Sequence, residues 1–445
     1  MGAGFLLLAG LPAWRAEPLP FVAAYLLLFA GYSAVLFRWL GIRGARAARI
    51  IFISGAVFRV LVLLLHPPDL SQDVARYAWD GYLATQHINP YAHPPADPAL
   101  IPYRTDFFGD ISYKNIPTIY PPTAQLLFLL AALLHPGTFA VRMLLVACDL
   151  GVMLGILRLL QRAGLPEGRL LVYAWCPLPV VEIASSGHLE PLGTLCLIAI
   201  PLALAADRRG AAGAALSGAV LAKVLPLALA PLVLRRGGRR AGVGALLAAG
   251  VLVGPFLAAG PRLLTGLGEY ATRWRYNDFL FAWLVALFQR LDPSGLLEQM
   301  RDRLGPAAGA FFLKFASPGG AARLVAAGLA GLAVLWVAFR PQPAARGSAG
   351  FMQDAGLILA VCLLLSPTFH PWYLLWLLPV LCFVPSPPWI LLSGSLVASY
   401  LYFPPAGGVS AGPSVAAWIE FAPAILLGIV LAFRKGGGVL PGPLR

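Results

Sequence analysis

The sequence DLSQDVARYAWDGYLATQHINPY, residues 69–91, decides how the chain is organised, because it begins a long polar region in an otherwise apolar chain. This region lies between Leu65 and Thr118 and brings carboxylates, arginines, histidines and aromatic residues together. Apolar segments stand on both sides of it. We therefore expect the polar region to carry the chemistry and the apolar segments to form its scaffold.

The composition identifies that scaffold as a membrane protein. The chain has 445 residues, of which 59% are hydrophobic and 12% charged, and its mean hydropathy is +0.78. Many apolar runs reach the roughly 20 residues that a transmembrane helix requires. The sequence predicts an all-α fold, a polytopic transmembrane helix bundle of about 10–13 spans, some short or re-entrant, with external loops that bear short helices. We interpret residues 1–445 as a single integral domain of the plasma (inner) membrane.

Basic clusters between the apolar runs predict the orientation of the chain. Lys and Arg outnumber Asp and Glu by 33 to 19, and the excess lies in short loops. Such loops are typical of the cytoplasmic side of a membrane protein, so the positive charge does not indicate a nucleic-acid partner. Counting spans from these clusters places two regions outside: the loop 67–118, predicted to be catalytic, and the region 260–320, predicted to bind substrate.

Two parts of the chain do not fit a simple alternation of spans. Between 119 and 206 the charged residues require a short or re-entrant element, and the Pro-containing segments 119–134 and 170–183 are the candidates. Residues 211–234 have basic clusters on both sides and must cross an even number of times. A short hairpin with its turn near Lys223 and Pro226 satisfies that requirement.

Polar side chains of the first external loop are predicted to share one helix face. Their spacings of three, four and seven residues align them in a helix; they are Asp73, Arg76, Tyr77 and Asp80. Asp73 lies nearest the preceding span, where a carboxylate can act as a base on a substrate held at the membrane surface. The alternative is a solvated surface helix with an ion pair between Asp73 and Arg76. Tyr120, in the Pro-rich segment TIYPPTAQ, is expected to line a stiff pocket wall.

Further ionisable residues fall at predicted ends of spans. GHLEPLG, residues 187–193, contains His188 and Glu190. Ionisable groups at membrane depth are costly and are candidates for function, although a histidine there can also hydrogen-bond a neighbouring helix end. Lys223 has no acid near it in the sequence. Its ammonium group is therefore expected either to meet a lipid phosphate or to extend to the membrane surface.

The predicted outer side contains three more candidates for substrate binding. SPTFHPWY, residues 366–373, contains His370 and Trp372, and the second external region contains Arg273. An aromatic belt at the membrane interface explains Trp372 by itself but does not explain a histidine beside two prolines.

Neither a cofactor nor a metal ion is indicated. His87, His93 and Asp97 are residue types that bind zinc, but their spacing in a Pro-rich loop matches no recognised pattern. The five cysteines lie in apolar segments and form no CxxC pair. A divalent metal therefore remains an option that no motif supports.

The ordered set of motifs resembles a known class of enzymes. SQDVARYAWDG, HINPY, TIYPPTAQLLF, GHLEPLG, AKVLPL and SPTFHPWYLLW make the chain similar, over roughly residues 65–380, to GT-C membrane glycosyltransferases. The closest resemblance is to the polyprenyl-phosphate-mannose-dependent mannosyltransferases of glycosyltransferase family 87 and its relatives. It implies a GT-C-like fold and an essential acid in the first external loop, which is Asp73 by position. One departure is Glu190, which stands where the family pattern has an aspartate.

The resemblance implies an inverting glycosyltransferase that moves a sugar, expected to be mannose, from a polyprenyl-phosphate-linked donor to a lipid or glycan acceptor at the non-cytoplasmic face. Its partners would be these two substrates and membrane lipids, with no cofactor. A lipid phosphate leaves readily, so one base (Asp73) and one cation (Lys223, Arg76 or Arg273) suffice. A retaining mechanism needs two carboxylates about 5 Å apart, whereas Asp73 and Asp80 are separated by about 10 Å along a helix axis.

Two other functions fit a membrane protein with ionisable residues near its spans. A transporter or flippase of a lipid-linked saccharide predicts inverted repeats and polar groups at the midplane, and the sequence shows neither. A glycan polymerase or ligase would have a similar large loop, but it depends on arginine or histidine there, whereas carboxylates dominate this loop.

Overall fold

The computed structural model describes residues 1–291, 317–341, 347–402 and 413–436, with isolated positions (295, 299, 302 and 303) between the first two ranges. It confirms the predicted all-α class, since these residues form helices and no β-strand. Within these ranges, seven helices are long and apolar enough to cross a membrane, one of them within the longer helical stretch Leu225–Arg273. They are α2 (Pro18–Trp39), α3 (Ala45–Leu65), α6 (Thr138–Arg162), α11 (Ala230–Val253, which non-helical backbone at Gly238 divides in two), α16 (Pro318–Phe339), α17 (Gly347–Leu364) and α20 (Val415–Gly436).

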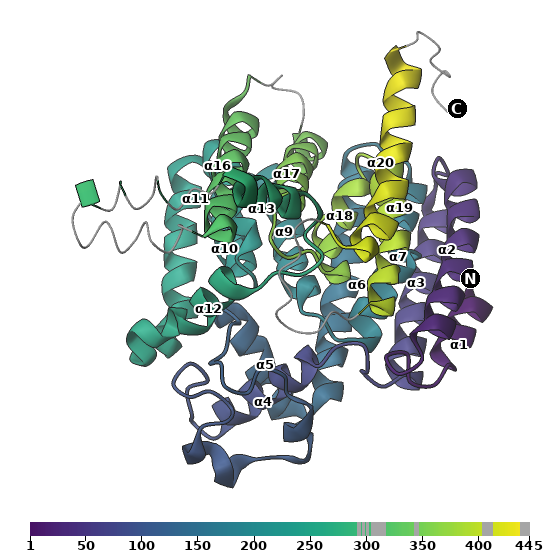
Figure 1. Ribbon diagram of the computed structural model, residues 1–445. Helices are drawn as coiled ribbons and strands as arrows, with labels where there is room; N and C mark the ends of the chain where they lie inside the picture. Colours follow the sequence, from purple (N-terminus) through teal and green to yellow (C-terminus); the bar gives the residue numbers. More distant parts are fainter. Residues whose placement is uncertain are drawn as a thin grey trace.

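Shorter helices complete the bundle shown in Figure 1. Those at the N-terminus and beside the long helices are α1 (Gly2–Ala9), α5 (Pro122–Leu134), α9 (Glu190–Ala205), α10 (Arg209–Val220), α13 (Phe279–Leu291), α18 (Leu378–Leu381) and α19 (Pro387–Ser395). The ends of the long helices follow local sequence: Pro18 begins α2, where its missing N–H is not needed, and α3 ends at Leu65, two residues before Pro67.

The segment between 119 and 206 contains the irregular element that the charge pattern required. Helix α5 has only 13 residues, and the chain from Glu167 to Ser185 is broken into a 3-10 turn, α7 (Leu171–Ala174), α8 (Pro177–Pro179) and a π-helical turn (Val180–Ser185). Nearly every residue from Leu170 to Ser185 is buried. The irregular backbone is thus covered by protein, as membrane depth demands.

The hairpin predicted for 211–234 is also present. Helix α10 runs from Arg209 to Val220, the chain turns at 221–224, and a 3-10 helix (Leu225–Leu229) leads back into α11. The two ends of the hairpin meet, because a Cβ atom on Gly237 would lie 3.9 Å from that of Arg209. With 12 residues, α10 is about 18 Å long and too short to cross the membrane alone.

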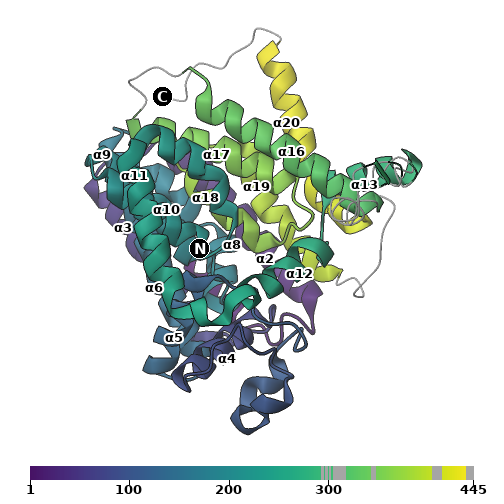
Figure 2. The ribbon, with the colours of Figure 1, turned by 90° about the vertical axis from the view of Figure 1, so that its left-hand side faces the viewer.

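The polar loop 67–118 forms a lobe at one end of the bundle, drawn at the bottom of Figure 1. It contains α4 (Asp73–Thr85) and two 3-10 helices, Pro98–Tyr103 and Asp106–Asp110. Helix α12 (Thr265–Arg273) lies between this lobe and the bundle in Figure 2. Much of the predicted substrate-binding region 260–320, from 292 to 316 apart from the isolated positions, lies outside the described residues.

Candidate active site

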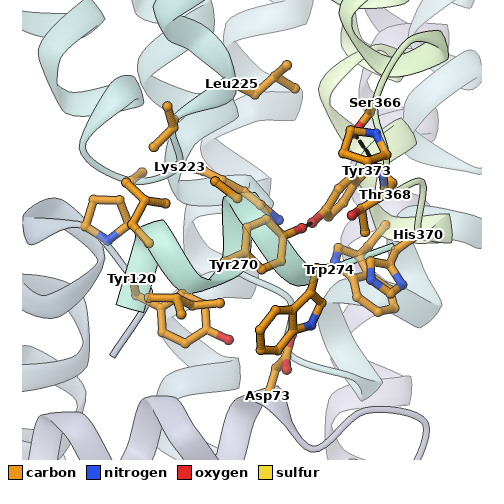
Figure 3. A pocket seen from close by; sticks show the side chains of 18 of the residues that line it. Asp73, Tyr120, Lys223, Leu225, Tyr270, Trp274, Ser366, Thr368, His370 and Tyr373 are labelled. Carbon is orange, nitrogen blue, oxygen red and sulfur yellow. Dashed lines mark hydrogen bonds between the residues drawn. The ribbon is translucent and has the colours of Figure 1, made fainter. Parts of the chain in front are cut away.

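A cavity of about 560 Å³ lies where the polar lobe meets the bundle. Its lining comes from α4, the loop 112–121, the hairpin tip 222–225, α12 with Trp274, Arg323 of α16, and the segment 362–376. Figure 3 shows Asp73 rising from α4 on one side, with Lys223, Tyr270 and Tyr373 converging on the other. The cavity therefore gathers residues of four of the motifs that the sequence singled out: SQDVARYAWDG, TIYPPTAQLLF, AKVLPL and SPTFHPWYLLW.

Asp73, in the first turn of α4, is partly exposed to this cavity. Its backbone N–H donates to the Ser71 hydroxyl (3.2 Å), while its carboxylate accepts no hydrogen bond from any described residue. Burial raises the pKa of Asp73, and the nearby His188, Lys223 and Arg76 oppose that rise. A carboxylate with free lone pairs and an elevated pKa is suited to accepting a proton from a bound hydroxyl group.

Arg76 lines the cavity and also forms hydrogen bonds within the lobe. Its Nε donates to Asp80 Oδ1 at 2.8 Å and its Nη1 to the carbonyl of Ile116 at 3.1 Å. The other Asp80 oxygen accepts from Gln125 Nε2 at 3.1 Å. The alternative pairing of Arg76 with Asp73 is therefore wrong, and Asp80 is a buried residue behind the cavity that holds Arg76 in place.

Tyr77 and Tyr120 both line the cavity, and their rings contact edge to face at 4.7 Å between centroids. Tyr77 also stacks on Phe128 of α5 at 4.6 Å. Such contact requires α4 and α5 to lie very close. A Cβ atom added at Gly81 would come within 2.1 Å of the Phe128 carbonyl oxygen, so only glycine fits at this crossing.

Lys223 does not have the unpaired ammonium group that the sequence suggested. Its Nζ forms a short ion pair with Glu190 Oε1 and lies 4.1 Å from the centre of the Tyr373 ring. The acid escaped sequence analysis because it lies 33 residues away and reaches Lys223 only through the hairpin. Glu190 is almost fully buried, whereas Lys223 is 26% exposed and lines the cavity. Lys223 is therefore the member of the pair that a ligand in the cavity can contact.

His188 is buried behind the cavity and belongs to a stack of rings. Trp372 lies between His188 (centroids 3.7 Å apart) and His370 (4.2 Å), and His370 in turn stacks on Tyr276 at 4.3 Å. His188 Nδ1 is 3.0 Å from Glu182 Oε2, without hydrogen-bond alignment. Burial, with Lys223 and His188 adding to it, lowers the pKa of His370 well below its usual range, which keeps this cavity-lining imidazole neutral.

The segment 366–376 is fixed from two sides. Phe369 N–H donates to the Tyr276 carbonyl at 2.8 Å, and Tyr276 N–H donates to the Pro367 carbonyl at 3.1 Å, which joins it to the region after α12. On the other side, Trp376 packs against Gly193 so closely that a Cβ atom there would lie 2.1 Å from the indole. The motifs GHLEPLG and SPTFHPWYLLW are therefore direct neighbours.

Two arginines differ from the sequence-based expectation. Arg273 does not line the cavity; it is 74% exposed and pairs with Glu269 at 2.9 Å. Arg323 does line it, and its Nη2 donates to the carbonyl of Trp274 at 2.9 Å. An arginine in the second turn of an apolar helix was the available signal, since ionisable residues in membrane-spanning helices are costly and usually have a functional reason. Tyr270, Trp274 and Tyr373 were likewise not singled out as ligands.

Cations outnumber carboxylates in the lining of the cavity, and two of these cations are paired with acids buried behind it. Among the described residues that line it, Asp73 is the one carboxylate, against the cations Arg76, Lys223 and Arg323. The rings of Trp274 and Tyr373 also line the cavity, and aromatic faces of this kind pack against sugar rings. No cluster of three potential metal ligands occurs within the described part of the chain.

An all-α membrane bundle whose polar lobe covers a cavity with one carboxylate and several cations has the features of a GT-C membrane glycosyltransferase. Comparison with known families makes this specific. The chain belongs to the family of the alpha-(1->6)-mannopyranosyltransferase N-terminal domain, whose sequence model matches residues 5–236. A search of curated proteins gave no significant match. The matched residues include Asp73, Glu190 and Lys223, and the family supports a mannosyltransferase activity for this protein.

Proposed function

We propose that the protein transfers mannose from a polyprenyl-phosphate-linked donor to a hydroxyl group of a lipid or glycan acceptor, with inversion, at the non-cytoplasmic face of the plasma membrane. The observation that carries this proposal is that the Asp73 carboxylate, which has no hydrogen-bond partner among the described residues, faces the same cavity as Lys223. The family's α-(1→6) linkage is the expected product linkage.

The reaction is a single displacement at the anomeric carbon. The acceptor oxygen attacks this carbon as Asp73 takes its proton, and the bond to the phosphate oxygen breaks at the same time. The electron pair leaves with the polyprenyl phosphate, whose developing charge Lys223 and Arg323 stabilise. One carboxylate in the cavity is sufficient for this route, whereas a retaining mechanism would need a second one about 5 Å away.

The apolar part of the cavity suits a lipid-linked donor. Val224, Leu225 and Leu267 line it beside Lys223, so a phosphate at the ammonium group has hydrocarbon surface next to it. The neutral His370 and the rings of Trp372 and Trp274 would then contact the sugar and acceptor. The basic loops of the chain support the assignment of the cavity to the non-cytoplasmic side.

The donor assignment is tested with purified protein and a panel of radiolabelled donors. Polyprenyl-phosphate mannose should yield labelled product with an acceptor extract, and nucleotide-linked mannose should not when the lipid donor is absent. Polyprenyl-phosphate glucose serves as the control for the sugar. Transfer from the nucleotide donor alone would overturn the proposal, as would equal transfer of glucose for the choice of mannose.

A further inference from the structure

A second cavity, of about 750 Å³, lies at the other end of the hairpin from Lys223. Lys223 is at the hairpin tip, while Arg209, Arg235 and Arg236 at its base line this second cavity. The remaining walls come from the end of α6, the end of α9, and the facing ends of α16 and α17. No part of the proposed reaction uses it.

The second cavity is strongly cationic. Among the described residues, four arginines line it (Arg162, Arg209, Arg235 and Arg236) together with one acid, Asp207, which gives this part of the lining a formal charge of +3. Adding the directly bonded neighbours Arg340 and Asp354 leaves that surplus unchanged. A positive surplus of this size attracts an anion.

Two of the arginines are anchored by protein groups. Arg235 Nη1 donates to the carbonyls of Ala338 and Arg340 at the end of α16, and Arg236 Nη2 donates to Asp354 Oδ2 at 2.7 Å. Their guanidinium groups are therefore held in place before a ligand arrives, which reduces the entropy lost on binding.

The other two arginines are available to a ligand. Arg209 pairs with Asp207 at 2.8 Å, but both side chains are largely exposed, at 48% and 72%, and such pairs contribute little. Arg162, in the last turn of α6, has no side-chain hydrogen bond or ion pair with any described residue. Together they can bind phosphate oxygens without breaking any buried contact.

The remaining lining is apolar and belongs to a membrane-spanning bundle. Pro201, Leu204, Leu232 and Phe351 line the cavity beside the arginines. A small soluble anion would leave this surface uncovered, whereas the glycerol and first methylene groups of a phospholipid would cover it. Helices α10 and α17 also begin at the cavity, at Arg209 and Gly347, and their N-terminal dipole ends favour negative charge.

We propose that this cavity binds the phosphodiester headgroup of an anionic phospholipid. Arg162 and Arg209 contact the phosphate, the anchored Arg235 and Arg236 supply the surrounding positive field, and the apolar wall receives the start of the acyl chains. This site is separate from the donor cavity and its existence does not depend on the proposed transferase reaction.

Native mass spectrometry of the full-length protein tests this site with two added lipids, phosphatidylglycerol and phosphatidylcholine of the same chains. The wild type should bind phosphatidylglycerol, which is anionic, more tightly than phosphatidylcholine, which is not. The Arg162→Gln/Arg209→Gln variant should bind phosphatidylglycerol roughly 30-fold more weakly than the wild type, since each basic residue contributes about fivefold. The matched control is Arg239→Gln/Arg240→Gln, two exposed arginines next to the cavity that do not line it. An equal loss in this control would overturn the proposal.

A gain of affinity keeps the test independent of folding defects. Asp207 competes for Arg209 and has a positive φ of 52° that asparagine also adopts, so Asp207→Asn should strengthen phosphatidylglycerol binding about fivefold. Unchanged binding in this variant would contradict the site. A further arm adds inorganic phosphate at millimolar concentration: retention of phosphatidylglycerol supports a lipid headgroup, and its displacement with retention of phosphate would show that the ligand is the free anion.

Discussion

The pKa of Asp73 is set by its burial and by four charged or ionisable neighbours. Burial raises its pKa, His188, Lys223 and Arg76 lower it, and Glu190 raises it. A general base is active only when deprotonated, so transfer should decline as the pH falls through the pKa of Asp73, which lies above the ordinary range of an aspartate. The decline of activity at acidic pH therefore reports the protonation of Asp73.

The pH profile should respond in opposite directions to the two members of the ion pair. Lys223→Met removes a positive neighbour and should raise the pKa of Asp73, which moves the acid limb of kcat/KM to higher pH. Glu190→Gln removes a negative neighbour and should move that limb to lower pH. The measurement is the pH dependence of kcat/KM for each variant. If the acid limb of kcat/KM stays at the wild-type pH in both variants, the titrating group is not Asp73.

Donor affinity should depend on Lys223. Lys223→Met removes a charge-assisted contact to the leaving phosphate and should weaken donor binding by about 10- to 100-fold. Lys223→Arg keeps the charge with a different geometry and should retain part of the affinity. Arg273→Met is the control, because Arg273 is exposed and does not line the cavity. Equal donor dissociation constants for Lys223→Met and wild type would remove the lysine from the phosphate site.

At the scale of helices, the crossing of α4 and α5 places Asp73 over the cavity. The close approach at Gly81 allows Tyr77 to stack on Phe128, which fixes α4. Gly81→Ala would force its Cβ against the Phe128 carbonyl and should destabilise the protein by about 1–3 kcal/mol while lowering the transfer rate.

Thermal unfolding in detergent and the transfer rate are measured for Gly81→Ala and for Gly109→Ala. Gly109 lies in the same lobe, and a Cβ atom there meets nothing within 4 Å. The control should unfold like the wild type. A Gly81→Ala variant as stable and active as the control would show that the crossing does not need glycine.

Elements with strong local signals were predictable from the sequence. Apolar length and basic loops predicted α2 and α3, the spacing of Asp73 to Asp80 predicted α4, and the paired basic clusters predicted the hairpin at Lys223. The partners of these residues were not predictable. The contacts of Lys223 with Glu190 and of His188 with Trp372 join segments far apart in the chain, and no local rule specifies such pairs.

Over the whole molecule, the cavity and the arginine-lined site lie at opposite ends of one hairpin, which makes the orientation testable. In a background without the five native cysteines, Asp110→Cys and Thr272→Cys should react with a membrane-impermeant thiol reagent on intact cells. Arg239→Cys should react only after permeabilisation. All three positions are exposed in the structure, so burial cannot mask the result. The reverse pattern would place the active site in the cytoplasm.

The family match indicates the sugar, which physical reasoning about the sequence and the fold did not supply. Composition and charge led to a membrane bundle with an acidic external loop, and the chemistry of a lipid phosphate required only a base and a cation. The choice of mannose rests on the family, and its sequence model ends at residue 236, before Tyr270, Arg323 and His370. These residues join the site through folding, so the structure extends the candidate site beyond the matched domain.

The central claim is that Asp73 removes the acceptor proton, and single-turnover transfer by Asp73→Asn tests it most directly. Purified variant and wild type are given polyprenyl-phosphate mannose and acceptor, and donor binding is measured on the same samples. Asp110→Asn, an exposed acid of the same lobe, is the matched control. We predict a rate about 100- to 10,000-fold lower for Asp73→Asn, with donor binding retained and the control unaffected. A transfer rate within a few-fold of wild type for correctly folded Asp73→Asn would contradict the account.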